Sequence, residues 1–116
     1  MKILVYYFHR FFDRRKLRKA IKEADTKFRN YHDRFYVLGN SDRRLYVLNK
    51  RMFKAMRADG YIHGDMFVRD MEEQCFYHTP YFNGHGQLTK EKRKAKLLAY
   101  DEFCVRCRMQ HNSHNV

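Results

Sequence analysis

The chain has 116 residues and a formal net charge of +12, and 44% of its residues are hydrophobic and 16% aromatic. A chain of this length most simply forms one domain, residues 1–116, and its apolar content excludes a disordered tail. The charge makes a polyanion the expected partner, either nucleic acid or an acidic protein surface, because a strong positive field concentrates negatively charged molecules around it.

The N-terminal run MKILVYYF is apolar but ends at His9 and Arg10. It is too short to span a bilayer and lacks the small-residue cleavage site of a signal peptide. The three cysteines, an odd number, argue against a disulfide framework and fit a reducing compartment. We therefore expect an intracellular (cytoplasmic) location, with no signal peptide and no membrane partner.

The first long element is expected to be a helix. Asp13 fits the N-cap of a helix that runs to about Tyr31, because apolar residues recur there at helical spacing. These residues are Leu17, Ala20, Ile21, Ala24 and Phe28, and the opposite face carries Arg15, Arg18, Lys19, Lys22 and Arg29. Residues 3–12 fit either a strand or an extension of this helix, and we favour the extension.

Two similar segments, RFYVL at 34–38 and RLYVL at 44–48, flank the turn-forming sequence GNSDR. This pattern predicts an antiparallel β-hairpin over about residues 34–48. If Leu38 pairs with Arg44, Tyr36 faces Tyr46. The other face is then formed by Phe35, Val37, Leu45 and Val47, and a helix must cover it.

Three further helices are expected downstream. Asn49 caps the first, which has Met52, Phe53 and Met56 facing inward and stops at Gly60. Asp65 opens a short second helix, MFVRDMEEQCFYH, which ends before Pro80. Thr89 caps the last, whose core stripe would be Ala95, Leu98, Ala99 and Phe103. The predicted fold class is α+β: a mostly helical single domain with one β-hairpin.

The cysteines occur in two short pairs with metal-ligand spacing, in CFYH (75–78) and CVRC (104–107). Zinc needs four converging ligands, usually delivered as two such pairs. A structural zinc site would use Cys75, His78, Cys104 and Cys107, with His85 or His111 as substitutes. The tail alone is unsuitable, since a helix would separate Cys104 from His114 by about 15 Å. Alternatively, the cysteines are small core residues and no cofactor is bound.

Three groups of residues are candidate nucleic-acid contacts: the outer face of the first helix, the solvent side of the hairpin and the start of the last helix. Tyrosines flanked by arginines suit single strands, because bases stack on the rings while guanidinium groups bind phosphates. The candidates are Arg15, Arg18, Lys19, Lys22, Arg34, Tyr36, Arg44, Tyr46, Lys92, Arg93 and Lys96. The two tyrosines fit equally a cross-strand pair that packs under another element.

Signatures of enzymes are weak. The chain has no Gly-rich phosphate loop, no G-x-S-x-G and no H-E-x-x-H. The hairpin superficially resembles a GIY-YIG nuclease, but the glycines of both signature triplets are absent. A metal-dependent nuclease site could be built from His63, Asp65, Asp70, Glu72, Glu73 and His78, whose spacing is equally that of a charged helix face. We expect a protein without catalytic residues and keep a small metal-dependent nuclease as an alternative.

Four segments, AIKEAD, RFYVL, LYVLNKRMFKAMRADGYI and CFYHTPYFNGHGQLTKEKRKAK, together resemble small basic proteins of unassigned function from tailed bacteriophages of gut bacteria. The resemblance covers residues 20–100 and implies a genome-binding accessory or a virion component. We therefore expect a non-enzymatic protein that binds nucleic acid. The alternative is a structural or assembly component that docks its basic face on an acidic protein.

Overall fold

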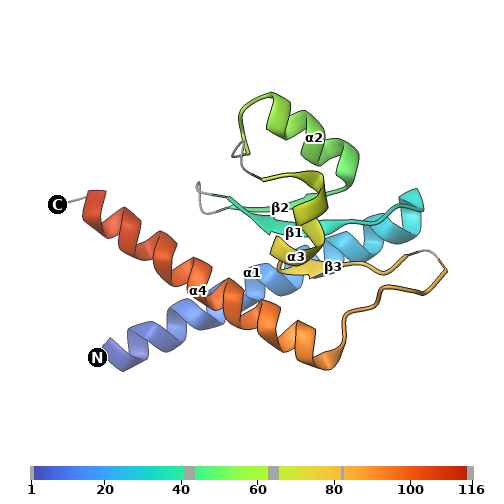
Figure 1. Ribbon diagram of the computed structural model, residues 1–116. Coiled ribbons are helices and arrows are strands. Elements are labelled where there is room, and N and C mark those ends of the chain that lie inside the picture. Colours follow the sequence, from blue (N-terminus) through green and yellow to red (C-terminus); the bar gives the residue numbers. More distant parts are fainter. Residues whose placement is uncertain (1, 41–43, 63–65, 82, 115–116) are drawn as a thin grey trace.

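The computed structural model describes residues 2–40, 44–62, 66–81 and 83–114, without the side chains of residues 2–7 and 111–114. Helices α1 (Lys2–Tyr31), α2 (Lys50–Ala58), α3 (Met71–Gln74) and α4 (Lys90–His114) surround a sheet of strands β1 (Tyr36–Gly39), β2 (Leu45–Leu48) and β3 (Tyr77–His78). A 3-10 turn, η1 (Val68–Asp70), precedes α3. The predicted α+β class is confirmed (Figure 1). None of the helices in these ranges is long and apolar enough to cross a membrane.

The hairpin forms as predicted, although its register differs. Leu38 pairs with Tyr46 and Tyr36 with Leu48, so the predicted pairing of Leu38 with Arg44 is wrong by two residues. Because the error is an even number, every side chain keeps its predicted face of the sheet. The turn at residues 41–43 lies outside the described residues.

A third strand, β3, lies where the sequence predicted a helix. Only Met71–Gln74 is α-helical in this region, and the backbone turns extended at Cys75 (φ −70°, ψ 157°). Strand β3 pairs antiparallel with β1, which makes β1 the central strand. The physical reason is that a buried central strand needs partners for the polar groups on both of its edges. The N–H of Phe76 donates to Val37 at 2.8 Å, and that of Thr79 donates to Phe35 at 3.0 Å.

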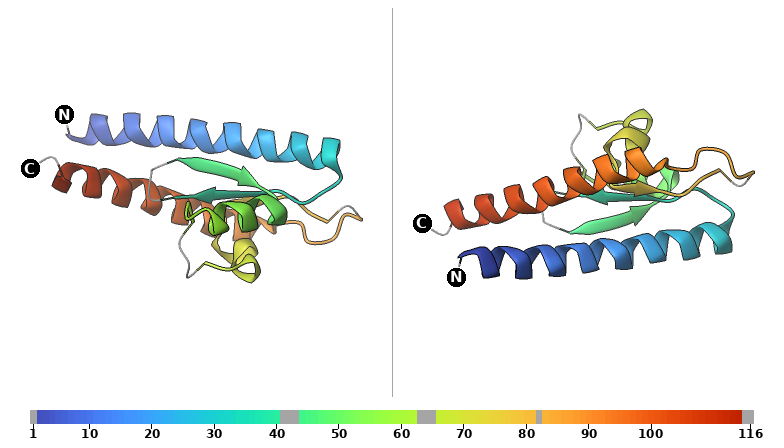
Figure 2. Two further views of the ribbon diagram at one scale, coloured as in Figure 1. Left: turned by 90° about the horizontal axis from the view of Figure 1, so that it is seen from above. Right: turned by 90° about the horizontal axis from the view of Figure 1, so that it is seen from below.

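Helices α1 and α4 cross on one face of the sheet (Figures 1 and 2). Helix α1 buries Leu17, Ala20 and Ala24 there, which confirms its predicted core stripe. The predicted stripe of α4 is confirmed only at Phe103, which packs against the core, and is wrong at Ala95, Leu98 and Ala99, which are exposed. The helix turns Leu97, Tyr100 and Cys104 inward instead, since an aromatic ring at the crossing buries far more apolar area than the alanines would.

Polar contacts fix the α1–α4 crossing. Helix α1 already runs through Asp13, so this residue is not an N-cap and the favoured extension over residues 3–12 is confirmed. The Asp13 carboxylate pairs with Arg108 at 2.6 Å, and the Asp13 carbonyl accepts a hydrogen bond from the Tyr100 hydroxyl. Arg14 pairs with Asp101 at 2.9 Å. The acids at the crossing are therefore engaged between the helices.

The second face of the sheet is covered by α2, η1 and α3. Its cluster contains Tyr36, Leu38, Leu48, Phe53 and Met71. The predicted cap of α2 is confirmed, because the Asn49 side chain accepts the N–H of Met52 at 2.8 Å, and Gly60 adopts a positive φ of 82° beyond the helix end. Both faces of the sheet are thus buried. Asp65, the predicted start of the next helix, lies outside the described residues.

Candidate nucleic-acid interface

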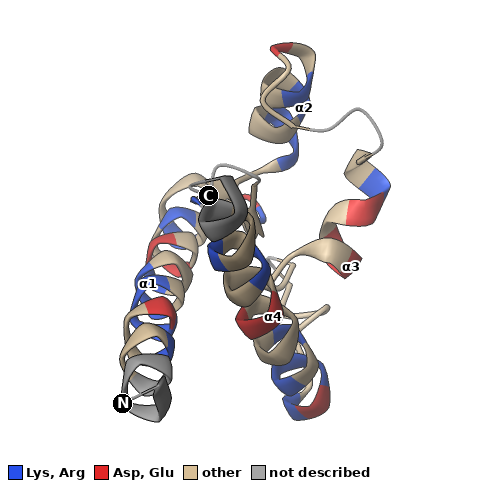
Figure 3. Ribbon diagram, turned by 90° about the vertical axis from the view of Figure 1, so that its left-hand side faces the viewer, with Lys and Arg blue, Asp and Glu red and all other residues tan. Residues whose placement is uncertain are grey.

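Lys and Arg residues recur along the ribbon of α1 (Figure 3), and four of them lie exposed on the face of the helix turned away from the sheet. These four are Arg15, Arg18, Lys19 and Lys22, as the sequence predicted. They recur at spacings of three and four, so they follow one side of the helix for about 10 Å. The acids of α1 lie elsewhere: Asp13 pairs with Arg108, Asp25 accepts the Tyr77 hydroxyl at 2.6 Å, and Glu23 lies 3.7 Å from Lys27 on the flank. We call Arg15, Arg18, Lys19 and Lys22 the α1 basic line.

A cleft of about 930 Å³ opens on one flank of α1, between this helix, β2 and the C-terminal half of α4. Its basic lining consists of Lys16, Lys19, Arg44 and Arg108, and its acids are Asp13 and Glu23. Tyr100, Phe103, Cys104 and Cys107 also line it. The fold therefore brings two predicted contacts from separate segments, Lys19 and Arg44, to one cleft.

A smaller hollow of about 390 Å³ lies on the other flank of α1. Arg14, Arg18 and Arg93 line it, with Asp25 as the acid. The Arg93 guanidinium lies over the Tyr77 ring, 5.8 Å from its centroid. The α1 basic line is therefore a ridge with a partly basic hollow on each side.

Of the two alternatives for the hairpin tyrosines, packing under another element holds for Tyr36 and in part for Tyr46. Tyr36 is only 1% exposed, and Tyr46 is half-buried against the same cluster. The cause is that α2 and α3 cover this face of the sheet, which the sequence assigned to solvent. Burial also raises the pKa of the Tyr36 hydroxyl. The Tyr36 ring is therefore inaccessible to a nucleic-acid base in this fold.

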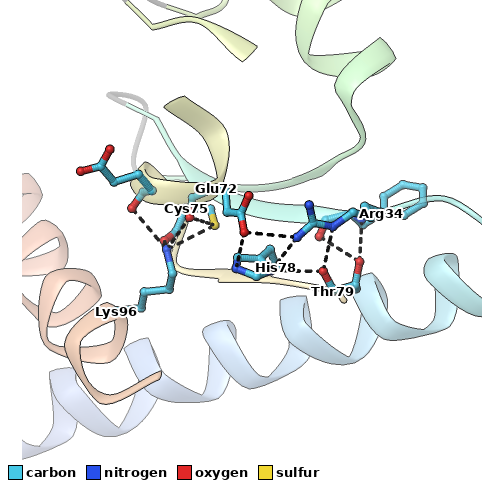
Figure 4. A network of polar contacts seen from close by, with 8 residues as sticks. Arg34, Glu72, Cys75, His78, Thr79 and Lys96 are labelled. Carbon is cyan, nitrogen blue, oxygen red and sulfur yellow. Dashed lines mark hydrogen bonds and ion pairs between the residues drawn. The ribbon is translucent and has the colours of Figure 1, made fainter. Parts of the chain in front are cut away.

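Arg34 is likewise buried and engaged within the protein (Figure 4). Its Nε donates to the Thr79 carbonyl at 3.2 Å, and its Nη2 lies 3.1 Å from His78 Nδ1. Its guanidinium stacks on the Tyr81 ring, 3.9 Å from the centroid. Arg34 is therefore not a candidate phosphate contact. Its contacts connect the segment just before β1 to the end of β3.

His78 lies beside Arg34 in this network. Burial lowers the pKa of His78, and the adjacent Arg34 cation lowers it further. A neutral ring fits the geometry: Nδ1 accepts from Arg34, while Nε2 faces a Glu72 carboxylate oxygen at 3.7 Å. The side chain thus serves a buried polar network.

The two lysines predicted near the start of α4 have different surroundings. The Lys96 ammonium donates to the carbonyls of Glu72, Glu73 and Cys75 at 2.8, 3.2 and 2.7 Å, so it satisfies the C-terminal end of α3. Lys92 is exposed in the first turn of α4, where the predicted Thr89 cap accepts its N–H at 3.2 Å. Only Lys92 of this pair presents its charge outward.

The four predicted zinc ligands do not come together. Cys75 packs in the Tyr36 cluster, with its Sγ 3.5 Å from the Lys96 ammonium. Cys104 lies eight residues beyond Lys96 on α4, about 12 Å along its axis, and packs towards α1. Burial raises the pKa of both thiols, that of Cys104 to about 11, which disfavours the metal-binding thiolate.

Other predicted metal ligands and acids have separate locations. Helix α4 continues to His114, so the tail is helical as the sequence analysis assumed. Asp70 accepts the N–H of Phe67 at 3.0 Å, and Glu72 lies 3.6 Å from Arg34. His85 is exposed. His63, Asp65 and the side chain of His111 lie outside the described residues. Among the residues that the structure describes, no three His, Cys, Asp or Glu side chains form a metal-binding group.

The clefts also contain basic residues that were not among the predicted contacts. Lys16 is one turn before Lys19, and Arg14 is one turn before Arg18, so helical spacing alone could have placed them on the flanks. Arg108 directly follows CVRC (104–107), a segment that was interpreted as metal ligands, so its charge was not considered.

No protein-family model, curated protein or solved structure matches the chain. Function must therefore be inferred from the charges, contacts and exposed surfaces of its own residues.

Proposed function

We propose that the protein is a non-enzymatic nucleic-acid-binding protein whose interface is the α1 basic line and its flanks. The interface residues are Arg15, Arg18, Lys19, Lys22, Lys16, Arg44, Lys92 and Arg93. The observation that carries this proposal is the separation of charge on α1. The exposed line holds only bases, while Asp13 and Asp25 point inward to Arg108 and Tyr77.

This arrangement is unfavourable for the free protein. Like charges three or four residues apart on a helix destabilise it by about 0.2–0.5 kcal/mol per pair. A surface shaped for solubility alone would mix the two signs. Phosphates along the line would turn this repulsion into attraction and release counterions from the nucleic acid. A genome-binding accessory is also one of the two roles, with a virion component, that the resemblance to small phage proteins implies.

Fluorescence anisotropy with labelled duplex DNA, single-stranded DNA and RNA of unrelated sequence tests the proposal. We expect binding at 50 mM salt and a linear fall of log K with log salt, with a slope of about −0.9 per phosphate contact for duplex and −0.7 for single strands. Six or more contacts would lower the duplex affinity by about 10³ or more between 50 and 200 mM salt. If the protein binds none of the three probes at 50 mM salt, the proposal is contradicted.

A second candidate is an assembly component that docks on an acidic protein. The observation that favours it is the outer face of α4, where Leu98, Val105 and Met109 are exposed along one side of the helix. Exposed apolar residues of this kind are typical of protein contacts. Competition with poly-L-glutamate separates the two functions: an acidic-protein dock predicts displacement of the labelled DNA at similar charge concentrations, and nucleic-acid binding predicts little displacement.

A further inference from the structure

The α1 basic line continues towards the N-terminus as three exposed phenylalanines. Phe8, Phe11 and Phe12 are 57%, 55% and 51% exposed. Positions 8, 11, 12, 15, 18, 19 and 22 all follow the three-and-four spacing of one helix face. The aromatic cluster and the basic line therefore share one outward surface, which extends for about 21 Å along the axis.

The core does not account for these rings. The side of α1 that meets the sheet and α4 carries Asp13, Leu17 and Ala20, and the phenylalanines lie on the opposite side. Phe11 and Phe12 contact each other edge-to-face, with centroids 5.5 Å apart at 80°. Three large apolar side chains in one exposed helical turn form the kind of patch that marks an interaction site.

The positive charge of the α1 basic line restricts which ligand can cover the three phenylalanines beside it. Arg15 lies one turn from Phe11 and Phe12, and the shared outer face carries no acid from Phe8 to Lys22. A ligand that covers the whole surface must combine negative charges with flat apolar groups. Single-stranded nucleic acid has both, because its phosphates can lie along the basic side chains of the protein while its unpaired nucleobases stack on aromatic side chains. A duplex keeps its rings stacked on one another.

We infer that Phe8, Phe11 and Phe12 are a stacking platform for unpaired bases of single-stranded nucleic acid whose phosphates lie along the α1 basic line. This inference rests on the proposed function and specifies its ligand. It also replaces the hairpin tyrosines, of which Tyr36 is buried and Tyr46 half-buried, by rings that are exposed. The described part of the structure thus places aromatic and basic contacts on a single helix.

Replacing the three phenylalanines by leucine tests stacking, because leucine keeps the apolar character but has no aromatic face. We expect the Phe8→Leu, Phe11→Leu, Phe12→Leu variant to lose single-strand affinity by about 5- to 150-fold for each ring that stacks. Its duplex affinity and the salt slope of its single-strand binding should stay unchanged, since no charge is removed. Tyr61→Leu, which removes an exposed aromatic side chain beyond α2, is the matched control.

A spectroscopic measurement reports on the ring itself. The chain contains no tryptophan, so Phe12→Trp introduces a single indole on the platform. Stacking predicts that a single-stranded oligonucleotide quenches its fluorescence, while the indole of Tyr61→Trp does not respond. Thermal unfolding of each variant checks that the fold is intact, as expected for substitutions at exposed positions.

The outcomes separate this inference from the proposed function. Unchanged single-strand affinity of the leucine variant overturns the stacking platform, while salt-dependent binding by the same variant leaves the proposed function in place. Absence of binding by the unmodified protein overturns the proposed function itself. Two other results also overturn the platform. One is a dimer in sedimentation that the leucine variant dissociates, and the other is an indole at position 12 that responds to phosphatidylglycerol vesicles and not to oligonucleotide.

Discussion

Lys96 and Cys75, which the sequence assigned to two different sites, contact each other inside the fold (Figure 4). The Lys96 ammonium lies 2.7 Å from the Cys75 carbonyl and also reaches the carbonyls of Glu72 and Glu73. Helix α3 is a single turn, so its last carbonyls have no donors within the helix. Lys96 supplies these donors and ties α4 to the segment before β3.

Removing this ammonium should destabilise the protein. We expect Lys96→Met to lower the free energy of unfolding by about 1–2 kcal/mol, because charged hydrogen bonds to carbonyls are lost at a partly exposed site. Lys94→Met, at an exposed position on the same helix, should change it by less than about 0.5 kcal/mol. Urea denaturation measures both, and equal effects of the two substitutions would argue against the contact.

Thr79 connects β1 to the end of β3 through its side chain. Its Oγ1 accepts the N–H of Phe35 at 2.9 Å, and the residue is fully buried. Thr79→Val keeps the shape but leaves this N–H without an acceptor, so we expect a loss of about 1–3 kcal/mol. Thr79→Ser retains the hydroxyl and should cost less. A valine variant as stable as the serine variant would show that the hydrogen bond does not matter.

Gly39 packs closely against Phe103 of α4 and against Phe76. A Cβ at this position would lie 2.6 Å from Phe103 Cζ and 2.8 Å from Phe76 Cε2. Gly39→Ala should therefore destabilise the protein by about 1–3 kcal/mol through overpacking. Phe103→Leu in the same chain should recover part of this loss, which a double-mutant cycle would detect as coupling. Additive effects would mean that the two residues are not in contact.

The neutral state of His78 predicts sensitivity to mild acid. Burial lowers the pKa of His78 in the folded protein, so the unfolded chain, with a histidine pKa of about 6.5, binds the proton first. The free energy of unfolding should be highest above pH 6.5 and decrease as the pH falls below that value. Comparing urea denaturation at pH 7 and 5 measures this, and the decrease should be smaller in His78→Gln. The His85→Gln control should retain the full decrease, and an identical pH dependence in His78→Gln would contradict the assignment.

Local features of the chain were predictable from the sequence. The core stripe of α1, the Asn49 cap, the positive φ of Gly60 and the two faces of the hairpin depend on spacing and capping within one element. The exposed line on α1 follows from the same periodicity. These features need no knowledge of distant partners.

Features set by distant partners were not predictable. Strand β3 has two residues and exists because β1 offers a free edge about 40 residues earlier in the chain. The burial of Arg34 and Tyr36 depends on α2 and α3 covering the second face of the sheet. The exposure of Phe8, Phe11 and Phe12 was not predicted, because an apolar run suggests a core when only the sequence is read.

The most direct test of the account compares two triple variants that remove equal charge. Arg15→Gln, Lys19→Gln and Lys22→Gln neutralise the α1 basic line, while Lys50→Gln, Arg51→Gln and Lys54→Gln neutralise exposed bases of α2 on the opposite side of the sheet. In salt-titrated DNA binding, the α1 variant should reduce the magnitude of the log K against log salt slope by about 2–3, and the α2 variant should leave it nearly unchanged. Equal reductions in both variants would show that net charge, and not the α1 surface, determines binding.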